Sequence, residues 1–440
     1  MTTTTHSSIP AVQKSWFPIA CIGLLFFIFG FITWINSALI PFLQMVCELS
    51  EIEALFIAFC FYFAYVVMAI PMAKILEKTG YQKGMSLGLL IIALGCLLFV
   101  PAAITKTFAV FLVAQFVVGS GLTILQTASN PYVVRLGPEE SAAARIAIMG
   151  LLNKAAGALA PVLFTVLVLG SFADITQASL AQMDEASRLA QIDSMSAKLI
   201  TPYVGIAIAL GLLALVFGKI SLPDLAAQEQ EESQSHQPAN SVLAFPHLVL
   251  GAVTLFCYVG VEVIAGDTIG LYGSSLGVAN ATSLGAYTMT AMVIGYLLGL
   301  IFIPKLISQS DALLFSAGLG LALSLAIVFA SNTSTVISSV IWGWAGIQVI
   351  PDTLALIALL GLANAMVWPA VWPLALEGLG NMTAKGSAVL VMGIAGGAIL
   401  PLVYGVVGEV SSSQVAYSVM IPCYAFIAYY ALRGHKKRSW

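Results

Sequence analysis

The sequence predicts an all-α membrane protein in which twelve transmembrane helices form two six-helix bundles. Its composition is the first reason: 60% of the 440 residues are hydrophobic and only 8% are charged, whereas soluble domains carry about 25% charged residues. The second reason is that apolar runs of about twenty residues, the length that an α-helix needs to cross a bilayer, recur along the whole chain. The period-two alternation of polar and apolar residues that is typical of a membrane β-barrel is not seen in the sequence.

These apolar runs define the individual spans and the division of the chain. A Gln-, Glu- and Ser-rich stretch without an apolar face separates six spans from six, and its composition is typical of a flexible linker. We therefore expect an N-terminal bundle over 1–221, a cytoplasmic linker over 222–243 and a C-terminal bundle over 244–440. The predicted spans cover residues 17–43, 52–76, 82–103, 107–134, 144–170, 199–220, 246–273, 281–304, 311–331, 353–376, 383–409 and 412–432.

The placement of the basic residues predicts the orientation. If the N-terminus is cytoplasmic, most of the 17 Lys and Arg residues fall on the cytoplasmic side. Lys106, Arg188 and Lys198 fall outside, and Lys154 lies within a span. This positive-inside bias predicts that both termini are cytoplasmic. The polar first residues lack the short apolar core of a cleaved signal peptide, so we expect none.

Two segments lie outside this plan. Residues 171–198 form an outer loop with helical periodicity, which predicts a short surface helix. Residues 332–352 are semi-apolar, and we expect either an extension of the ninth helix or an interfacial segment marked by Trp342 and Trp344.

The sequence does not favour an enzyme or a metalloprotein. The six cysteines have no CxxC spacing, and the four histidines lie in the tails, in the linker or at the start of a helix. We expect no cofactor and no nucleic-acid partner. The expected partners are a small-molecule sugar, Na⁺ or H⁺ and the lipid bilayer, and we expect a monomer.

Polar side chains inside the spans are the candidate functional residues, because an ionisable group at mid-membrane costs about 3 kcal/mol or more. Pro131 directly follows one such residue, Asn130, and predicts a break near the end of the fourth helix. The polar residues are Thr33, Asn36 and Ser37 in the first span, Gln126 and Asn130 in the fourth, Asn153 and Lys154 in the fifth, Glu262 and Asp267 in the seventh, and Asn364 with Trp368 and Trp372 in the tenth.

The tenth span has the pattern that a sugar requires. Asn364, Trp368 and Trp372 are spaced i, i+4 and i+8, which places an amide and two indoles along one helix face. Amides bind sugar hydroxyls, and the apolar C–H face of a sugar stacks on an aromatic ring. The alternative interpretation is that the indoles pack between helices and the amide forms an interhelical hydrogen bond.

Lys154 is a charged residue inside an apolar span, where a lysine is not expected. It lies nine residues after Arg145, or about 14 Å along a helix, and therefore near the centre of a bilayer core about 30 Å thick. It forms either a structural ion pair or a fixed positive charge in a transport cavity. The expected carboxylate partner is Glu262, followed by Asp267.

Several motifs resemble the fucose–hexose branch of the major facilitator superfamily, in particular its bacterial glucose/galactose and N-acetylglucosamine transporters. They are TWINSALIP in the first span, GLTILQTASNPYVVRLGPE in the fourth, YVGVEV in the seventh and LEGLGNMTAKGSAVLVMGIAGGAILPLVYG across the tenth and eleventh. The resemblance covers nearly the whole chain. It implies a sugar transporter of the bacterial inner (plasma) membrane, whose two bundles rock about a central site.

The resemblance also bears on ion coupling. Fucose permeases carry an aspartate just after the first-span asparagine and a glutamate in the fourth span, and both are tied to proton coupling. The matching residues here are Ser37 and Gln126, which cannot carry a proton. The glucose/galactose members carry a glutamate that matches Glu262, and they include sodium-driven carriers.

Three coupling hypotheses follow for a hexose importer, with N-acetylglucosamine as the alternative substrate. The first is Na⁺ symport with Glu262 as a possible Na⁺ ligand and Asp267 nearby, because hard cations take oxygen ligands. The second is H⁺ symport through Glu262, and the third is an uncoupled facilitator in which the Lys154 ammonium replaces a cation. The expected sugar-binding residues are Asn36, Gln126, Asn130, Asn153, Lys154, Asn364, Trp368 and Trp372.

Overall fold

The computed structural model describes residues 16–136, 142–170, 175, 177–220, 222, 242–302, 306–379 and 382–440. In these ranges every regular element is a helix, and 12 helical segments are long and apolar enough to span a membrane. The predicted fold class and the predicted number of spans are therefore confirmed. Most of the predicted linker, 222–243, falls outside the described residues, so the domain boundaries remain a prediction.

The N-terminal half contains six of these spans. Two of them, Glu51–Leu76 and Lys78–Thr105, belong to one labelled helix with a kink at Gly80, where φ is 74°. Glycine adopts this positive-φ conformation without the steric penalty that a Cβ atom would cause. The elements are α1 (Trp16–Trp34), α2 (Asn36–Val46), α3 (Glu51–Thr105), α4 (Phe108–Arg135), α5 (Ala142–Phe164), the π-helical η2 (Thr165–Leu169), α6 (Gln177–Ala181), α7 (Glu185–Ala197) and α8 (Ile200–Lys219).

The C-terminal half contains the other six spans, and short 3₁₀ turns interrupt or flank several of them. Its elements are η4 (Val242–Ala244), α10 (Pro246–Ser275), η5 (Ala281–Ser283), α11 (Gly285–Phe302), α12 (Gln309–Phe329), α13 (Val336–Ile341), η6 (Gly343–Ala345), α14 (Asp352–Ala365), α15 (Val367–Leu376), α16 (Thr383–Met392), η8 (Gly393–Ala395), α17 (Gly396–Val410), α18 (Ser413–Ala416), η9 (Tyr417–Val419), α19 (Met420–Leu432) and η10 (Gly434–Lys436).

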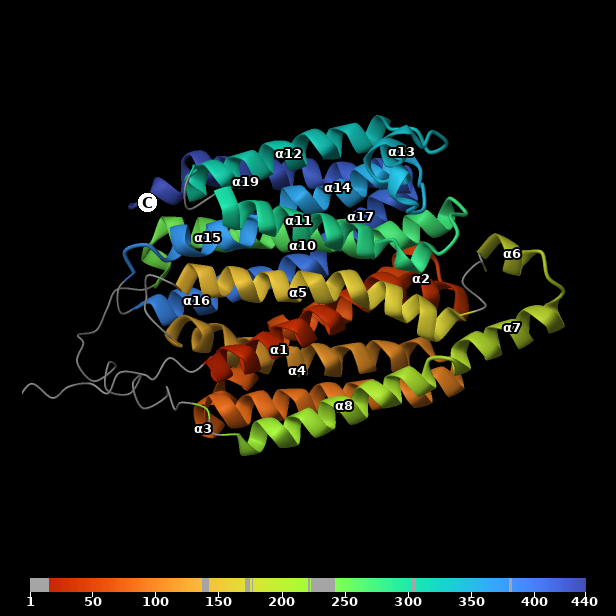
Figure 1. The fold of residues 1–440 in the computed structure, drawn as a ribbon, viewed down its shortest axis with the longest axis horizontal. Helices are drawn as coiled ribbons and strands as arrows, with labels where there is room; N and C mark the ends of the chain where they lie inside the picture. Colours follow the sequence, from red (N-terminus) through yellow and green to blue (C-terminus); the bar gives the residue numbers. More distant parts are fainter. Residues whose placement is uncertain are drawn as a thin grey trace, which may run out of the picture.

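The long helices run side by side (Figure 1), and the two halves meet mainly where α5 packs on α11, α3 on α17 and α2 on α10. We call the end of the bundle that holds the C-terminus the terminal end, on the left in Figure 1, and the end that carries α6 and α7 the distal end. The helix predicted within 171–198 is confirmed by α7. The segment 332–352 contains the separate short helix α13 rather than an extension of α12, and the indole of Trp344 after it is 81% exposed.

The helix α7 packs on the N-terminal half. Ser196 donates a hydrogen bond to the carbonyl oxygen of Ala103 over 2.7 Å, and Arg188 forms an ion pair with Glu48 at 3.1 Å. Lys106, at the end of α3, is paired with Asp193 of α7. These contacts attach the segment to one of the two halves.

The first span contains an interruption that the sequence did not predict. The first span breaks at Ile35, between α1 and α2. Pro41 lacks an amide hydrogen, and its ring clashes with the carbonyl group of Ser37, four residues earlier. The Ser37 hydroxyl donates to the carbonyl oxygen of Trp34 over 2.8 Å. The Ser37 carbonyl, freed by Pro41, lies against α10 at Gly270.

Proline also divides the tenth span. Pro369 is close behind the point where α14 ends and α15 begins, as expected from its clash with the carbonyl group four residues earlier. Asn364 belongs to α14, whereas Trp368 and Trp372 belong to α15, and the single stripe of all three residues stays a prediction. The predicted break at Pro131 is wrong, since α4 continues to Arg135. In membrane helices neighbouring groups can satisfy the carbonyl that a proline frees.

Polar contacts close the distal end between the two halves. The Thr165 hydroxyl in the π-helical turn η2 lies 2.7 Å from the Thr282 hydroxyl in η5. Ser413 of α18 donates to the carboxylate of Glu51 at the start of α3 over 2.7 Å. The structure therefore represents a form of the protein that is closed at this end.

Glycine allows the halves to approach closely beneath these contacts. A Cβ atom on Gly270 of α10 would lie only 2.8 Å from the carbonyl oxygen of Ser37, and one on Gly266 would lie 2.5 Å from the Trp34 ring. A Cβ on Gly285 of α11 would lie 2.3 Å from the Ser37 hydroxyl. We call this contact of α10 and α11 with α1 and α2 the glycine seam.

We predict that Gly270→Ala opens the distal end. The added methyl group meets backbone rather than a flexible side chain, and such overpacking costs about 1–3 kcal/mol. Spin labels at the exposed distal residues Thr105 and Ser411, in a background without native cysteines, should show a longer distance in the variant. Gly205→Ala is the matched control, because nothing lies within 4 Å of its Cβ position. Unchanged distances in Gly270→Ala would contradict the tight packing of the seam.

Candidate substrate and ion-coupling site

An ion pair joins the two halves near the middle of the spans Arg145–Val168 and Pro246–Ser275. The Lys154 ammonium of α5 lies 2.6 Å from Oε1 of Glu262 of α10, and the two side chains are only 10% and 8% exposed. Tyr258, one helical turn before Glu262, donates its hydroxyl to the same oxygen over 2.7 Å. The predicted first partner of Lys154 is therefore confirmed.

Trp34 covers the ammonium group. The Lys154 Nζ lies 4.5 Å from the centroid of the Trp34 ring, and a desolvated cation–π contact of this kind contributes about 2 kcal/mol. The indole nitrogen donates to Oδ1 of Asn153 over 3.4 Å. Gly157 of α5 and Gly266 of α10 leave space for the ring, since a Cβ on either would lie 2.5–2.6 Å from it. The ring is thus held between both halves.

This arrangement explains how a lysine is accommodated at this depth. Two opposite charges in contact form a neutral unit, whereas either charge alone would be buried without compensation. Removing one partner of a buried ion pair typically costs 3–5 kcal/mol. The ion pair therefore links α5 to α10 in this form of the protein.

An aromatic row extends from the ion pair toward the terminal end. The ring centroids of Tyr258 and Trp368 are 6.2 Å apart, and those of Trp368 and Trp372 are 5.5 Å apart. The predicted shared face of the two indoles is thus confirmed. The Trp372 indole nitrogen is buried and has no hydrogen-bond partner among the described residues. It is an available donor beside an aromatic surface.

The amide of Asn364 lies deeper in the C-terminal half. Its Oδ1 accepts a hydrogen bond from the Tyr424 hydroxyl over 2.8 Å. Its Nδ2 is buried, and no described residue accepts from it. One side of this amide is thus fixed by α19, and the other side keeps an unused donor.

The candidate amides of the N-terminal half are held in pairs. Asn36 accepts from Gln115 over 2.7 Å, and the Nδ2 of Asn36 is a second buried donor without a described partner. Gln126 donates to the Tyr65 hydroxyl over 2.8 Å. Asn130, one turn further along α4, is half-buried.

Asp267 does not share the ion pair. It lies on α10 between Glu262 and the distal end, and its side chain is completely buried. Neither carboxyl oxygen has a hydrogen-bond partner among the described residues. The sequence predicts it as the second candidate partner of Lys154, but Lys154 contacts Glu262.

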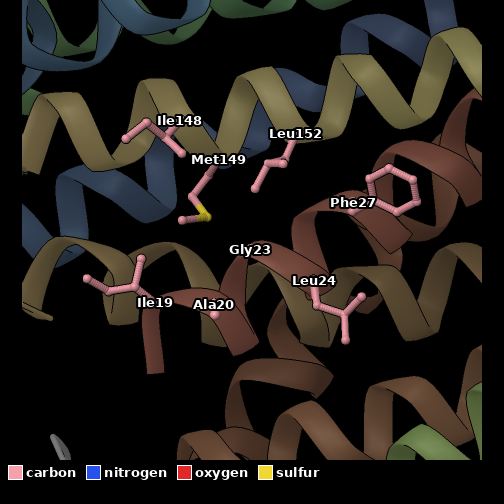
Figure 2. Close-up of a pocket in the computed structure, with 8 residues that line it drawn as sticks. All are labelled: Ile19, Ala20, Gly23, Leu24, Phe27, Ile148, Met149 and Leu152. Atoms are coloured by element: carbon pink, nitrogen blue, oxygen red, sulfur yellow. The ribbon is translucent and has the colours of Figure 1, made fainter. Parts of the chain in front are cut away.

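A separate, open apolar hollow with a volume of about 360 Å³ lies between α1 and α5 (Figure 2). A sugar site requires hydrogen-bonding groups, and this hollow offers almost none. We therefore do not assign it to the substrate. It is lined by Ile19, Ala20, Gly23, Leu24, Phe27, Ile148, Met149 and Leu152.

Comparison with known proteins is decisive for the family. Residues 22–401 match the Major Facilitator Superfamily. The chain belongs to this superfamily. It is accordingly a multi-pass membrane transporter rather than an enzyme, which confirms the resemblance seen in the sequence motifs.

The sequences of several named relatives align with almost the whole chain. The chain is 34% identical to a glucose/galactose transporter of Brucella abortus, over 98% of this chain and 97% of that protein. It is 29% identical to the L-fucose-proton symporter of Escherichia coli, over 94% and 92% of the two chains. A crystal structure of the transporter FucP in the outward conformation has a TM-score of 0.70, with 28% identity over 94% of this chain and 97% of that one.

Several side chains that contact the candidate site residues of this transporter were not predicted from its sequence. Tyr258 was detectable, because it lies one helical turn before Glu262 and therefore on the same face. Trp34 was visible in TWINSALIP, but only the fold brings it to Lys154. Gln115, Tyr65 and Tyr424 carry no sequence signal that would link them to the site.

We predict that Lys154→Met destabilises the transporter by about 3–5 kcal/mol, because it leaves Glu262 buried without its partner. The double variant Lys154→Met/Glu262→Gln should recover most of this loss, since glutamine can still accept from Tyr258. Unfolding temperatures of the purified proteins in detergent test both expectations.

The matched control is Lys106→Met, because its ion pair with Asp193 is exposed and such pairs contribute about 0–1 kcal/mol. Equal destabilisation in the single and double variants would show that the charges themselves are not responsible.

Proposed function

We propose that this transporter imports a hexose of the glucose/galactose type across a bacterial inner membrane by alternating access, and that protons drive it. The observation that carries the mechanism is the ion pair between Lys154 and Glu262, which spans the two halves at mid-membrane. The names of the relatives support a sugar as the substrate.

Unused hydrogen-bond donors support a sugar ligand. The side-chain nitrogens of Asn36, Asn364 and Trp372 are buried without a described partner. An unsatisfied buried donor costs about 1–3 kcal/mol, and a sugar hydroxyl can accept from each. The rings of Trp368 and Trp372 offer the apolar surface on which a pyranose stacks. Gln126, Asn130 and Asn153 would contribute from the N-terminal half.

The closed distal end supports alternating access. If both termini are cytoplasmic, as the basic residues predict, the distal end faces outward and the protein is closed toward the outside. A movement of the two halves against each other would then separate the glycine seam. Contacts near the middle, including the ion pair, lie closest to the pivot of such a movement.

The ion pair argues against a Na⁺ ion bound at Glu262. Oε1 of Glu262 already accepts from Lys154 and Tyr258, and the ammonium group would repel a second cation at contact distance. Sodium symport through Glu262, the first hypothesis from the sequence, is therefore not the mechanism we propose. A relative named as a proton symporter supports the choice of H⁺.

One alternative has support from the same observation. An ammonium group that neutralises Glu262 permanently could replace a transported cation, and the protein would then be an uncoupled facilitator. Coupled and uncoupled transport differ in whether sugar accumulates above its equilibrium level, so the two are separable by a single uptake experiment.

We predict that proteoliposomes concentrate labelled glucose or galactose when an inward pH gradient is imposed, and that a protonophore abolishes this. An inward Na⁺ gradient at uniform pH should have no effect. Accumulation driven by Na⁺ would overturn proton coupling, whereas simple equilibration in every arm would establish a facilitator. No uptake of either sugar would overturn the proposed substrate class.

We predict that Trp372→Phe raises the KM for sugar about fivefold, the equivalent of about 1 kcal/mol for one lost hydrogen bond. The phenyl ring keeps the stacking surface but lacks the indole donor. Trp344→Phe, at an exposed position after α13, is the matched control. An unchanged KM in Trp372→Phe would remove this donor from the sugar site.

A further inference from the structure

Asp267 is a buried carboxyl group that the proposed sugar site does not use. It is 0% exposed, and both of its oxygens lack a hydrogen-bond partner among the described residues. It lies five residues beyond Glu262 on α10, or about 7–8 Å along the helix axis toward the distal end. The ion pair therefore does not neutralise it by direct contact.

The helix around Asp267 belongs to the glycine seam. Gly266, directly before it, packs on the Trp34 ring, and Gly270, one turn later, packs on the Ser37 carbonyl. On another side of α10, Gly397 of α17 packs closely against both Val263 of α10 and Tyr62 of α3. Asp267 is thus buried in the stretch of α10 that packs against the N-terminal half.

The cost of burial determines the protonation state of Asp267 in this form. An isolated carboxylate without hydrogen bonds costs many kcal/mol in a low-dielectric interior, and such a group takes up a proton instead. The neutral acid costs far less. Opening of the seam would admit water, in which the carboxylate is the stable form at neutral pH.

We propose that Asp267 is the proton-binding site of the transporter and that the distal end closes only when Asp267 is protonated. This inference rests on the proposed proton-coupled transport. The step is a simple proton transfer: with the distal end open, the carboxylate takes one proton from hydronium and releases water. After closure and reorganisation, the proton returns to water on the terminal side.

Other charges near Asp267 fit this role. Lys154 and Glu262 both interact with it electrostatically. Because they neutralise each other, the group of three carries no net charge when Asp267 is protonated and one negative charge when it is not. Movement of the Lys154 ammonium toward Asp267 would favour release of the proton. The titratable groups around this stretch of α10 include Tyr62 and Glu51 from α3, Lys154 from α5, Tyr296 from α11, Tyr404 from α17, Tyr417 from η9 and Glu262 on α10 itself.

The pH dependence of closure follows from one proton. The closed form binds one more proton than the open form, so the ratio of closed to open protein should rise as the pH falls, by at most about tenfold per pH unit. Asp267→Asn keeps the size of the neutral acid and cannot ionise. It should close at every pH between 5 and 8.

The test measures closure and transport in the full-length protein. Distances between spin labels at Thr105 and Ser411 are recorded from pH 5 to pH 8 for the wild type, Asp267→Asn and Asp311→Asn. Asp311 is an exposed carboxylate near the start of α12, so the latter is the matched control. Glucose uptake driven by a pH gradient and glucose counterflow exchange are measured on the same proteins.

We expect pH-dependent closure in the wild type and in Asp311→Asn, and closure independent of pH in Asp267→Asn. The Asp267→Asn protein should lose accumulation but retain counterflow, which also shows that it is folded. Accumulation in Asp267→Asn, or closure that varies with pH as in the wild type, would overturn the inference. Failure of the wild type to accumulate sugar would instead overturn proton-coupled transport, while the distance measurements would still decide whether Asp267 controls closure.

Discussion

The structure depends on the neutralisation of one lysine in the middle of the membrane. Lys154 belongs to the N-terminal half and its partner Glu262 to the C-terminal half, so neither half alone satisfies its own charge. Trp34 makes a cation–π contact with the Lys154 ammonium group, and Tyr258 donates a hydrogen bond to the Glu262 carboxylate. The requirement to keep these groups together fixes how α5 and α10 face each other, and with them the glycine seam.

The sequence was sufficient for the fold and for part of the site, for physical reasons. The length of apolar runs is imposed by the bilayer, so the spans could be located with little error. The cost of burying a charge likewise singled out Lys154 and favoured Glu262 as its partner. The side chains that complete the site, such as Tyr424 and Gln115, come from other helices and are determined by tertiary packing alone.

Helix interruptions were the least predictable features because the effect of proline depends on its neighbours. Pro131 leaves α4 continuous, whereas Pro41 accompanies a break at Ile35 and Pro369 accompanies the division of the tenth span. Both interruptions lie beside candidate substrate residues, Asn36 and Asn364. Irregular backbone within the membrane is tolerated where it is buried in protein or lines a cavity, which is consistent with a binding region between the halves.

The attachment of α7 to one half has a practical consequence. Arg188, Asp193 and Ser196 connect this helix to residues of the N-terminal half, and much of its surface is exposed. An antibody fragment bound to the exposed face of α7 would therefore move as a rigid extension of that half. Such a fragment would add mass and a directional marker for electron microscopy without bridging the seam, and so without selecting one conformation.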